Sequence, residues 1–270
     1  MKKAIIYLVL FFAIQAICSL AVMGVWYLVK GVMPGEGGAF LVISTLLFSI
    51  VTMLLFGWRR WTPVNGNYLK TRPWSVLFWA GMAALGFLLP SDWFQEQIPE
   101  LPNQLKDSSN SIVNTPGGYL ALAILVPVAE EFVFRGAILR VLLKSFGADN
   151  SLKGVWIAIA LSALLFALAH MNPAQMPHAF IVGLLLGWFY WRTGSILPGV
   201  VYHVVNNTAS YVMMRIYPNL EDLTLTDFFG SEANVLKALG FSLLIFLPAI
   251  YQLHLCMNGN KKGELRSSPR

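Results

Sequence analysis

The sequence predicts an all-α fold, a polytopic membrane helix bundle of about eight transmembrane helices. The chain has 270 residues, of which 57% are hydrophobic and only 12% are charged, whereas about a quarter of the residues in an average soluble domain are charged. Long apolar runs recur along the chain, and basic residues gather near alternate ends of these runs. Both features are typical of integral membrane proteins.

A membrane-spanning helix needs roughly 20 mostly apolar residues. Lys2 and Lys3 precede a first run of about 26 residues, which is longer than the ~7 to 15 residues of a cleaved secretory signal, so we expect it to remain as an anchor. Several of the later runs are shorter than 20 residues, and their boundaries are approximate. The eight expected spans are Ala4–Val29, Phe40–Trp58, Trp74–Leu89, Tyr119–Leu143, Val155–His170, Ala179–Trp191, Ile196–Met213 and Leu236–Leu255.

The net charge of +6 is unevenly distributed. Eight spans with both termini in the cytoplasm place every basic cluster inside, as the positive-inside rule requires. We therefore expect these residues to serve as orientation signals and lipid-headgroup contacts in an integral membrane protein, of a bacterial plasma (inner) membrane, with no nucleic-acid partner. The clusters are Lys2 and Lys3; Arg59, Arg60, Lys70 and Arg72; Arg140, Lys144 and Lys153; Arg192; and Lys261, Lys262, Arg266 and Arg270.

The chain divides into three parts by the distribution of polar residues. Residues 1–117 are expected to form N-terminal anchoring transmembrane helices, residues 118–213 the core helices that carry the chemistry, and residues 214–270 an outer loop, a last transmembrane helix and a basic cytoplasmic tail. The connections Pro90–Gly118 and Tyr217–Val235 are long enough to form caps or partial lids on the outer side. With Cys18 and Cys256 the only cysteines, neither a disulfide framework nor a cysteine-based metal site is expected.

Two adjacent carboxylates and a guanidinium, those of Glu130, Glu131 and Arg135, lie in the middle of the otherwise apolar run from Tyr119 to Leu143. Each such side chain at the centre of a spanning helix costs roughly 2.5 to 3.5 kcal/mol, which indicates a functional site. Glu131 and Arg135 are four residues apart on one helical face, where an ion pair satisfies both. Glu130 is rotated by about 100° from Glu131, so we predict that Glu130 is the working carboxylate.

Histidines and asparagines supply further polar groups in the same core. His170 ends one apolar run, and His203 lies within another, four residues before Asn207. His203 and Asn207 therefore share a helical face and can converge on one substrate or one water. For His178 and His254, a structural contact is the favoured interpretation.

These residues carry a resemblance to a known family. The pattern resembles that of the CAAX proteases and bacteriocin-processing enzymes, the Abi or CPBP intramembrane proteases, which include the type II CAAX prenyl endopeptidases. The signature covers residues 130 to 207 and consists of Glu130-Glu131-x-x-x-Arg135, Phe166-x-x-x-His170 and His203-x-x-x-Asn207.

The resemblance implies a membrane-embedded endopeptidase of glutamate or metallo type. Glu130 would activate a water with help from His170, His203 and Asn207 would bind the scissile carbonyl and its oxyanion, and Glu131 with Arg135 would hold the helix and its electrostatics in place. A divalent metal such as zinc, held by Glu130, His170 and His203, remains open beside a metal-free mechanism. Phe166 belongs to the signature as a supporting residue.

Water and an extended substrate are tolerated at membrane depth only inside protein or a wet cavity. We therefore expect an intramembrane polar catalytic chamber that receives a peptide or a membrane-protein substrate from the bilayer. Two alternatives compete with the protease, a non-catalytic bacteriocin-immunity or scaffold protein and a proton-coupled transporter. The single polar cluster argues against the transporter, which would need a ladder of polar groups across the spans. The sequence leaves the substrate and the oligomeric state open.

Overall fold

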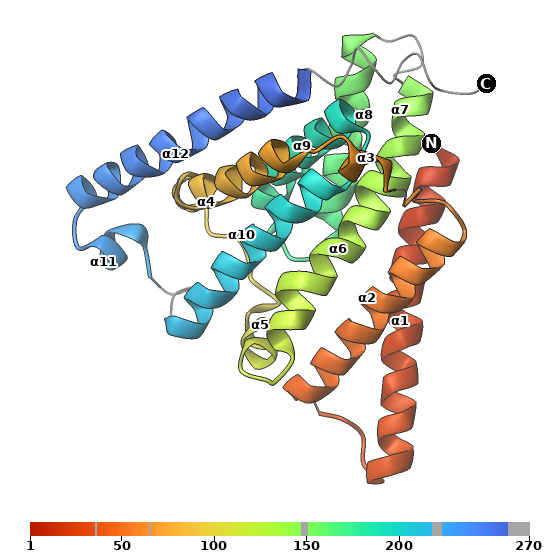
Figure 1. The fold of residues 1–270 in the computed structure, drawn as a ribbon. Helices are drawn as coiled ribbons and strands as arrows, with labels where there is room; N and C mark the ends of the chain where they lie inside the picture. Colours follow the sequence, from red (N-terminus) through yellow and green to blue (C-terminus); the bar gives the residue numbers. More distant parts are fainter. Residues whose placement is uncertain (36, 65, 147–150, 218–222, 259–270) are drawn as a thin grey trace.

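The computed structural model describes residues 1–35, 37–64, 66–146, 151–217 and 223–258. All regular secondary structure in these ranges is helical, which confirms the predicted all-α bundle (Figure 1). The elements are α1 (Lys2–Lys30), α2 (Gly38–Trp58), α3 (Asn67–Lys70), α4 (Trp74–Glu96), α5 (Lys106–Val113), η1 (Leu120–Leu125), α6 (Val126–Glu131), η2 (Phe132–Leu139), α7 (Arg140–Phe146), α8 (Leu152–Ala169), α9 (Met176–Thr193), α10 (Leu197–Ile216), α11 (Leu225–Phe229) and α12 (Glu232–Asn258).

Five of the described helices are long and apolar enough to cross a membrane, namely α1, α2, α4, α8 and α12. The other three predicted spans correspond to helices that are interrupted or more polar. One is a continuous helix from Leu120 to Phe146 in which η1 and η2 have π-helical geometry, and the others are α9 and α10. We call the helix from Leu120 to Phe146 the compound helix. The predicted count of eight spans is therefore not established, although each predicted apolar run is helical.

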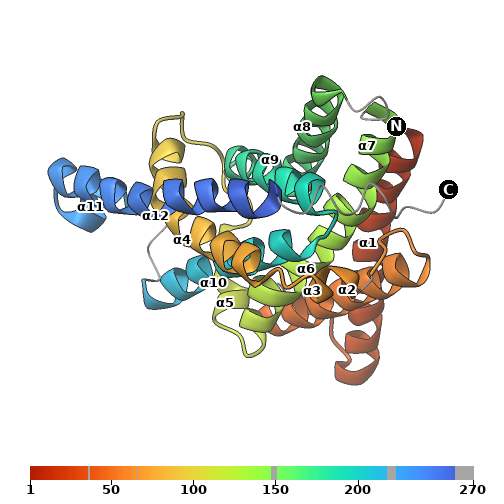
Figure 2. The same ribbon diagram turned by 45° about the horizontal axis from the view of Figure 1, so that its top comes forward.

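The compound helix lies at the centre of the bundle (Figure 1). Helices α1 and α2 pack together on one side of it and contact η2, while α10 contacts η1 and α6, and α8 contacts η2 and α7. On the far side, α12 runs along α4, as both views show (Figure 2). The polar segment predicted from the sequence is thus surrounded by protein on several sides.

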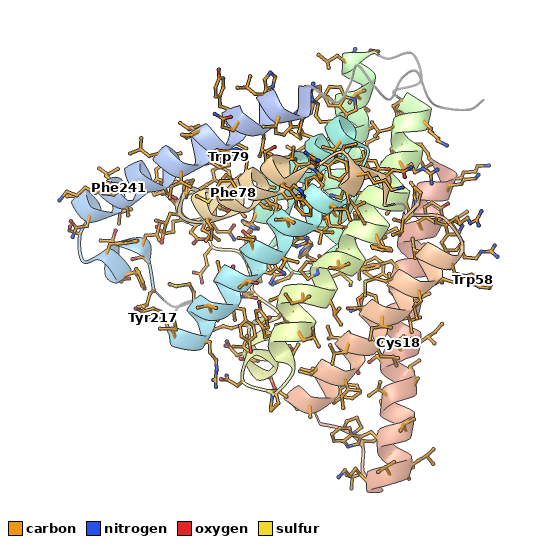
Figure 3. All side chains as sticks on the ribbon, in the orientation of Figure 1. Cys18, Trp58, Phe78, Trp79, Tyr217 and Phe241 are labelled. Carbon is orange, nitrogen blue, oxygen red and sulfur yellow. The ribbon has the colours of Figure 1, made fainter. Side chains whose placement is uncertain are left out.

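The surface of the bundle is strongly apolar. Trp58 is 78% exposed and Phe241 70% exposed, and both project outward with Phe78 (Figure 3). Charged Glu131 and Arg135 are instead buried. Apolar residues outside and charges inside are the arrangement expected of a protein whose surroundings are lipid.

The predicted connection from Pro90 is shorter than expected. Helix α4 continues through Pro90 to Glu96, so the loop that follows begins at residue 97. Proline is tolerated inside membrane helices because neighbouring groups satisfy the backbone that it frees. The end of α4 meets the start of α11, since the Leu225 amide donates a hydrogen bond to the Glu96 carboxylate at 2.5 Å.

Candidate active site

The two glutamates lie at the end of α6, between the two π-helical segments of the compound helix. Single π-helical turns occur frequently at functional sites. Side chains from other parts of the chain donate hydrogen bonds to carbonyls of both segments, which fixes this irregular backbone. The pairs are Asn207 Nδ2 to the Leu122 carbonyl at 3.1 Å, Ser162 Oγ to the Phe134 carbonyl at 3.1 Å, and Thr62 Oγ1 to the Phe132 carbonyl.

The predicted ion pair between Glu131 and Arg135 is present. Arg135 Nη1 donates to Glu131 Oε1 at 2.7 Å, and the two side chains are 1% and 0% exposed. The guanidinium also lies over the ring of Phe166, with 4.3 Å between Cζ and the ring centroid. A buried arginine that meets both a carboxylate and an aromatic face is held in one position, because its planar group suits both contacts.

The imidazole of His203 lies between the two glutamates. Its Nε2 is 3.6 Å from Glu130 Oε2, and its Nδ1 is 3.4 Å from Glu131 Oε1. These distances are longer than those of normal hydrogen bonds but well within the range of strong electrostatic interaction. The sequence placed His203 only beside Asn207, and this contact with both carboxylates is a finding of the structure.

Phe166 connects the two histidines. Its ring packs edge-on against His170, with the ring centroids 4.8 Å apart, and against His203, with the centroids 5.8 Å apart. His170 Nδ1 lies 2.9 Å from the Phe166 carbonyl oxygen, and because a carbonyl can only accept, Nδ1 carries the proton. In the neutral imidazole Nε2 is then the free acceptor. Glu130 and His170, both described, share no direct hydrogen bond.

Asn207 is oriented by its neighbours. One N–H of its amide bonds the Leu122 carbonyl, and Asn206 Nδ2 approaches its Oδ1 at 3.4 Å. Because Asn206 is buried and holds the oxygen of Asn207, the second N–H of Asn207 is the donor left for a substrate. Sequence reasoning noted both asparagines but assigned no role to Asn206.

Exposure separates the predicted site residues into two groups. Glu130 is 15% exposed in its side chain, and His170 and Asn207 are also partly exposed. Glu131, Arg135, Phe166 and His203 are buried. Three of the four predicted catalytic residues are therefore accessible, while the fourth, His203, is enclosed together with the supporting residues.

Gly199 and Thr62 also belong to the site, although nothing in the sequence alone singles them out. A Cβ at Gly199 would lie 2.4 Å from Glu131 Oε2, so only glycine lets the first turn of α10 approach this carboxylate. The positive end of the helix dipole favours a negative charge there. Thr62 similarly requires the absence of a Cβ at Gly136, because that atom would lie 2.3 Å from Thr62 Cγ2. Both are contacts between distant segments.

A divalent metal held by Glu130, His170 and His203 stays a prediction. The described part of the chain contains no group of three or more His, Cys, Asp or Glu side chains that could hold a metal ion. Glu130 approaches His203, whereas the contact that His170 and His203 share is with the ring of Phe166. His178, for which a structural contact is the favoured interpretation, lies in the first turn of α9, where it hydrogen-bonds Ser91 and stacks on Phe87.

Comparison with known proteins agrees with the predicted resemblance. Residues 113–209 match the family of Type II CAAX prenyl endopeptidase Rce1-like proteins, and this range contains every predicted site residue. A curated Escherichia coli protein, described as an uncharacterized 24.3 kDa protein, is 28% identical over 189 residues, which cover 64% of this chain and 81% of that protein. No solved structure matches. The resemblance stated from the sequence is therefore confirmed over residues 113–209.

Proposed function

We propose that the protein is an intramembrane endopeptidase of the CAAX-protease type, which hydrolyses peptide bonds with a water activated by Glu130 and His170. One observation carries the proposal. The segment that matches a prenyl endopeptidase family holds a partly exposed carboxylate, Glu130, whose Oε2 lies 3.6 Å from His203 Nε2. A carboxylate placed beside an imidazole at membrane depth costs free energy, so it indicates chemistry rather than packing.

Glu130 takes the part of the general base in this mechanism. Its carboxylate accepts a hydrogen bond from the water and removes the proton as the water oxygen attacks the scissile carbonyl carbon. Because His170 keeps its Nδ1 proton on the Phe166 carbonyl, its Nε2 is available to orient the same water. The proton then passes to the leaving amine when the carbon–nitrogen bond breaks.

His203 and Asn207 take the part of electrophilic partners. The free N–H of Asn207 and the His203 ring can donate to the carbonyl oxygen, where negative charge develops in the transition state. Asn206 fixes the amide of Asn207, and Glu131 with Arg135 holds His203 from its other side. These donors are in place before the substrate arrives, which is how such sites lower a barrier.

The substrate we propose is a peptide segment that reaches the site from the bilayer, at a bacterial inner membrane in which both termini of the enzyme are cytoplasmic. Locally extended backbone at this depth is tolerated only where protein or water satisfies it. The partly exposed positions of Glu130, His170 and Asn207 supply such groups.

The test compares peptide termini in membranes from cells that make the wild type, Glu130→Gln or Glu100→Gln at matched expression. Glu100 is exposed and lies in the loop after α4, so its variant controls for loss of one carboxylate. Termini present with wild type and Glu100→Gln but absent with Glu130→Gln would establish proteolysis and name the substrate. Identical profiles for all three, with any phenotype preserved, would favour the immunity or scaffold function instead.

Purified enzyme then decides the metal question. We expect cleavage to persist after chelation, because Glu130, His170 and His203 do not form a ready metal site. Loss of cleavage on chelation with recovery on addition of zinc would assign the metal-dependent route.

A further inference from the structure

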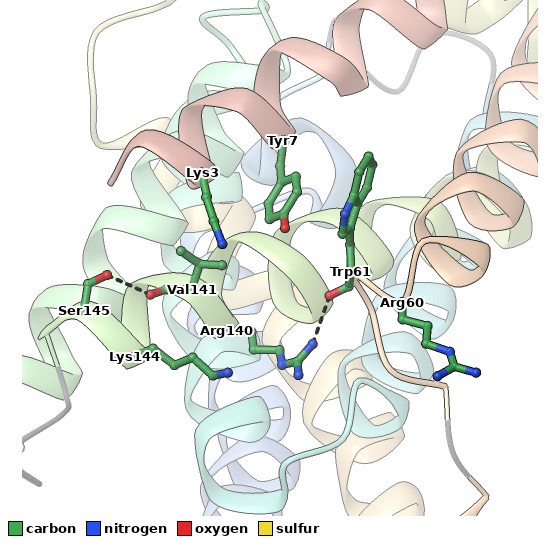
Figure 4. A pocket seen from close by; sticks show the side chains of 8 residues that line it. All are labelled: Lys3, Tyr7, Arg60, Trp61, Arg140, Val141, Lys144 and Ser145. Atoms are coloured by element: carbon green, nitrogen blue, oxygen red, sulfur yellow. Dashed lines mark hydrogen bonds between the residues drawn. The ribbon is translucent and has the colours of Figure 1, made fainter.

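A second site lies away from the catalytic residues, at the end of the bundle where α1 begins. A cavity of about 330 Å³ opens there between α1, the segment after α2, and α7. We call it the basic pocket, and its main lining residues are Lys3, Tyr7, Arg60, Trp61, Arg140 and Lys144 (Figure 4). Its volume falls within the range of small-ligand sites, roughly 300 to 1,000 Å³.

The charge of this pocket is of one sign. Lys3, Arg60, Arg140 and Lys144 all line it, and no acidic residue does. Within the part of the chain that the structure describes, none of these four cations forms an ion pair with a carboxylate. Like charges gathered in one cavity repel each other, and a bound anion would relieve this repulsion.

The polar groups of the pocket are largely free to bind a ligand. Arg140 donates one hydrogen bond to the Trp61 carbonyl, at 3.3 Å, and its planar guanidinium retains other donors. Lys3 and Tyr7 point from α1 toward α7, and Lys144 extends beside Arg140 (Figure 4). Arginine and lysine together are the donors that phosphate groups prefer.

The depth of the pocket indicates the source of the anion. Arg140 follows Glu130 by ten residues on one helix. At the α-helical rise of 1.5 Å per residue this separation is at most about 15 Å along the axis, and it is shorter where η2 is π-helical. The hydrocarbon core of a bilayer is about 30 Å thick, so for a glutamate at its midplane a site about half that thickness away along the axis would lie at headgroup level. Tyr7 and Trp61, whose rings are 5.2 Å apart, are residues that favour this interface.

We propose that the basic pocket binds the phosphate of an anionic phospholipid from the leaflet at this end of the bundle. Basic pockets between membrane helices bind such headgroups in other proteins. The pocket is also connected to the active-site helix, because the segment that holds Trp61 continues to Thr62, which donates to the Phe132 carbonyl in η2. A bound headgroup would therefore hold this segment against the helix that carries the glutamates.

The test uses full-length protein purified in detergent. It is titrated with short-chain phosphatidylglycerol and, separately, with phosphatidylcholine of the same chain length, and bound lipid is counted by native mass spectrometry. The pocket variant is Lys3→Gln/Lys144→Gln, and the matched control is Lys70→Gln/Lys153→Gln. All four lysines are exposed, and the two variants lose the same charge.

We expect wild type and the control to bind phosphatidylglycerol more tightly than phosphatidylcholine. The pocket variant should raise the Kd for phosphatidylglycerol by roughly tenfold or more and leave that for phosphatidylcholine unchanged. The variant Lys3→Arg/Lys144→Arg keeps both positive charges and should bind phosphatidylglycerol as tightly as wild type, which separates lost charge from misfolding.

Equal Kd values for phosphatidylglycerol in the pocket and control variants would overturn the proposal, as would equal binding of both lipids by wild type. Inorganic phosphate added as a competitor distinguishes the two sources of phosphate. If it displaces phosphatidylglycerol at comparable concentration, the pocket recognises a soluble phosphate and the lipid assignment is wrong.

Discussion

Replacement of Arg135 by methionine tests how the charges of the active site are supported. The change keeps an unbranched side chain of moderate length but removes the cation from Glu131, which is 0% exposed and otherwise has only His203 Nδ1, at 3.4 Å, as a nearby partner. Breaking a buried ion pair by removal of one partner costs about 3 to 5 kcal/mol, because the remaining charge is left uncompensated. We expect Arg135→Met to lower the free energy of unfolding by this amount.

A second variant separates the stranded charge from lost packing. In Glu131→Gln/Arg135→Met neither charge of the pair remains, and replacement of both partners of a buried pair is often close to neutral. The double variant still loses the contact of Arg135 with the Phe166 ring, which is worth about 2 kcal/mol where it is desolvated. We therefore expect it to be more stable than Arg135→Met by at least about 1 kcal/mol.

Unfolding by added SDS in mixed micelles, followed by circular dichroism, measures these differences. Arg215→Met is the control, because Arg215 is bound to the neutral side chain of Asn114 in an exposed hydrogen bond of 2.7 Å and should change stability by only about 0.5 kcal/mol. If Arg135→Met costs no more than Arg215→Met, or if the double variant is no more stable than Arg135→Met, the reasoning about a stranded Glu131 is refuted.

Three further changes probe other contacts of the site. Gly199→Ala should destabilise the protein by about 1 to 3 kcal/mol, because its Cβ would lie 2.4 Å from Glu131 Oε2. Its control is Gly240→Ala, which has open space around it and should stabilise α12 by up to about 1 kcal/mol. The same SDS titration should therefore show opposite signs for the two changes in the free energy of unfolding. Thr62→Val removes a buried donor to a carbonyl of η2 and should cost about 1 to 3 kcal/mol in that titration. Asn206→Ala should lower kcat about tenfold with little change in KM, if this residue only orients the neighbouring asparagine; a changed KM with constant kcat would contradict that role.

The local parts of the site could be predicted from the sequence because helical periodicity fixes them. The pairing of Glu131 with Arg135 follows from a spacing of four residues, and the structure contains it. The position of His203 between both glutamates depends on how α10 packs on α6, which periodicity does not determine. The approach of Gly199 to Glu131 is equally non-local.

The fold class could also be predicted from the sequence, whereas the element boundaries could not. Apolar runs longer than a globular core needs predict a membrane bundle. The continuation of α4 through Pro90 could not be predicted, because the neighbouring groups that tolerate a proline inside a helix come from other elements. The π-helical segments around Glu130 likewise depend on donors supplied by distant residues such as Thr62 and Ser162.

The charges of the cluster explain why a buried ion pair accompanies the proposed general base. Arg135 balances Glu131, so the formal charge that remains is that of Glu130, beside the imidazole of His203. In surroundings of low dielectric constant an uncompensated carboxylate is costly. Without Arg135, the charge of Glu131 would have only His203 Nδ1, at 3.4 Å, beside it. This would disturb the pairing of His203 with Glu130, so loss of Arg135 should remove catalysis even in a protein that still folds.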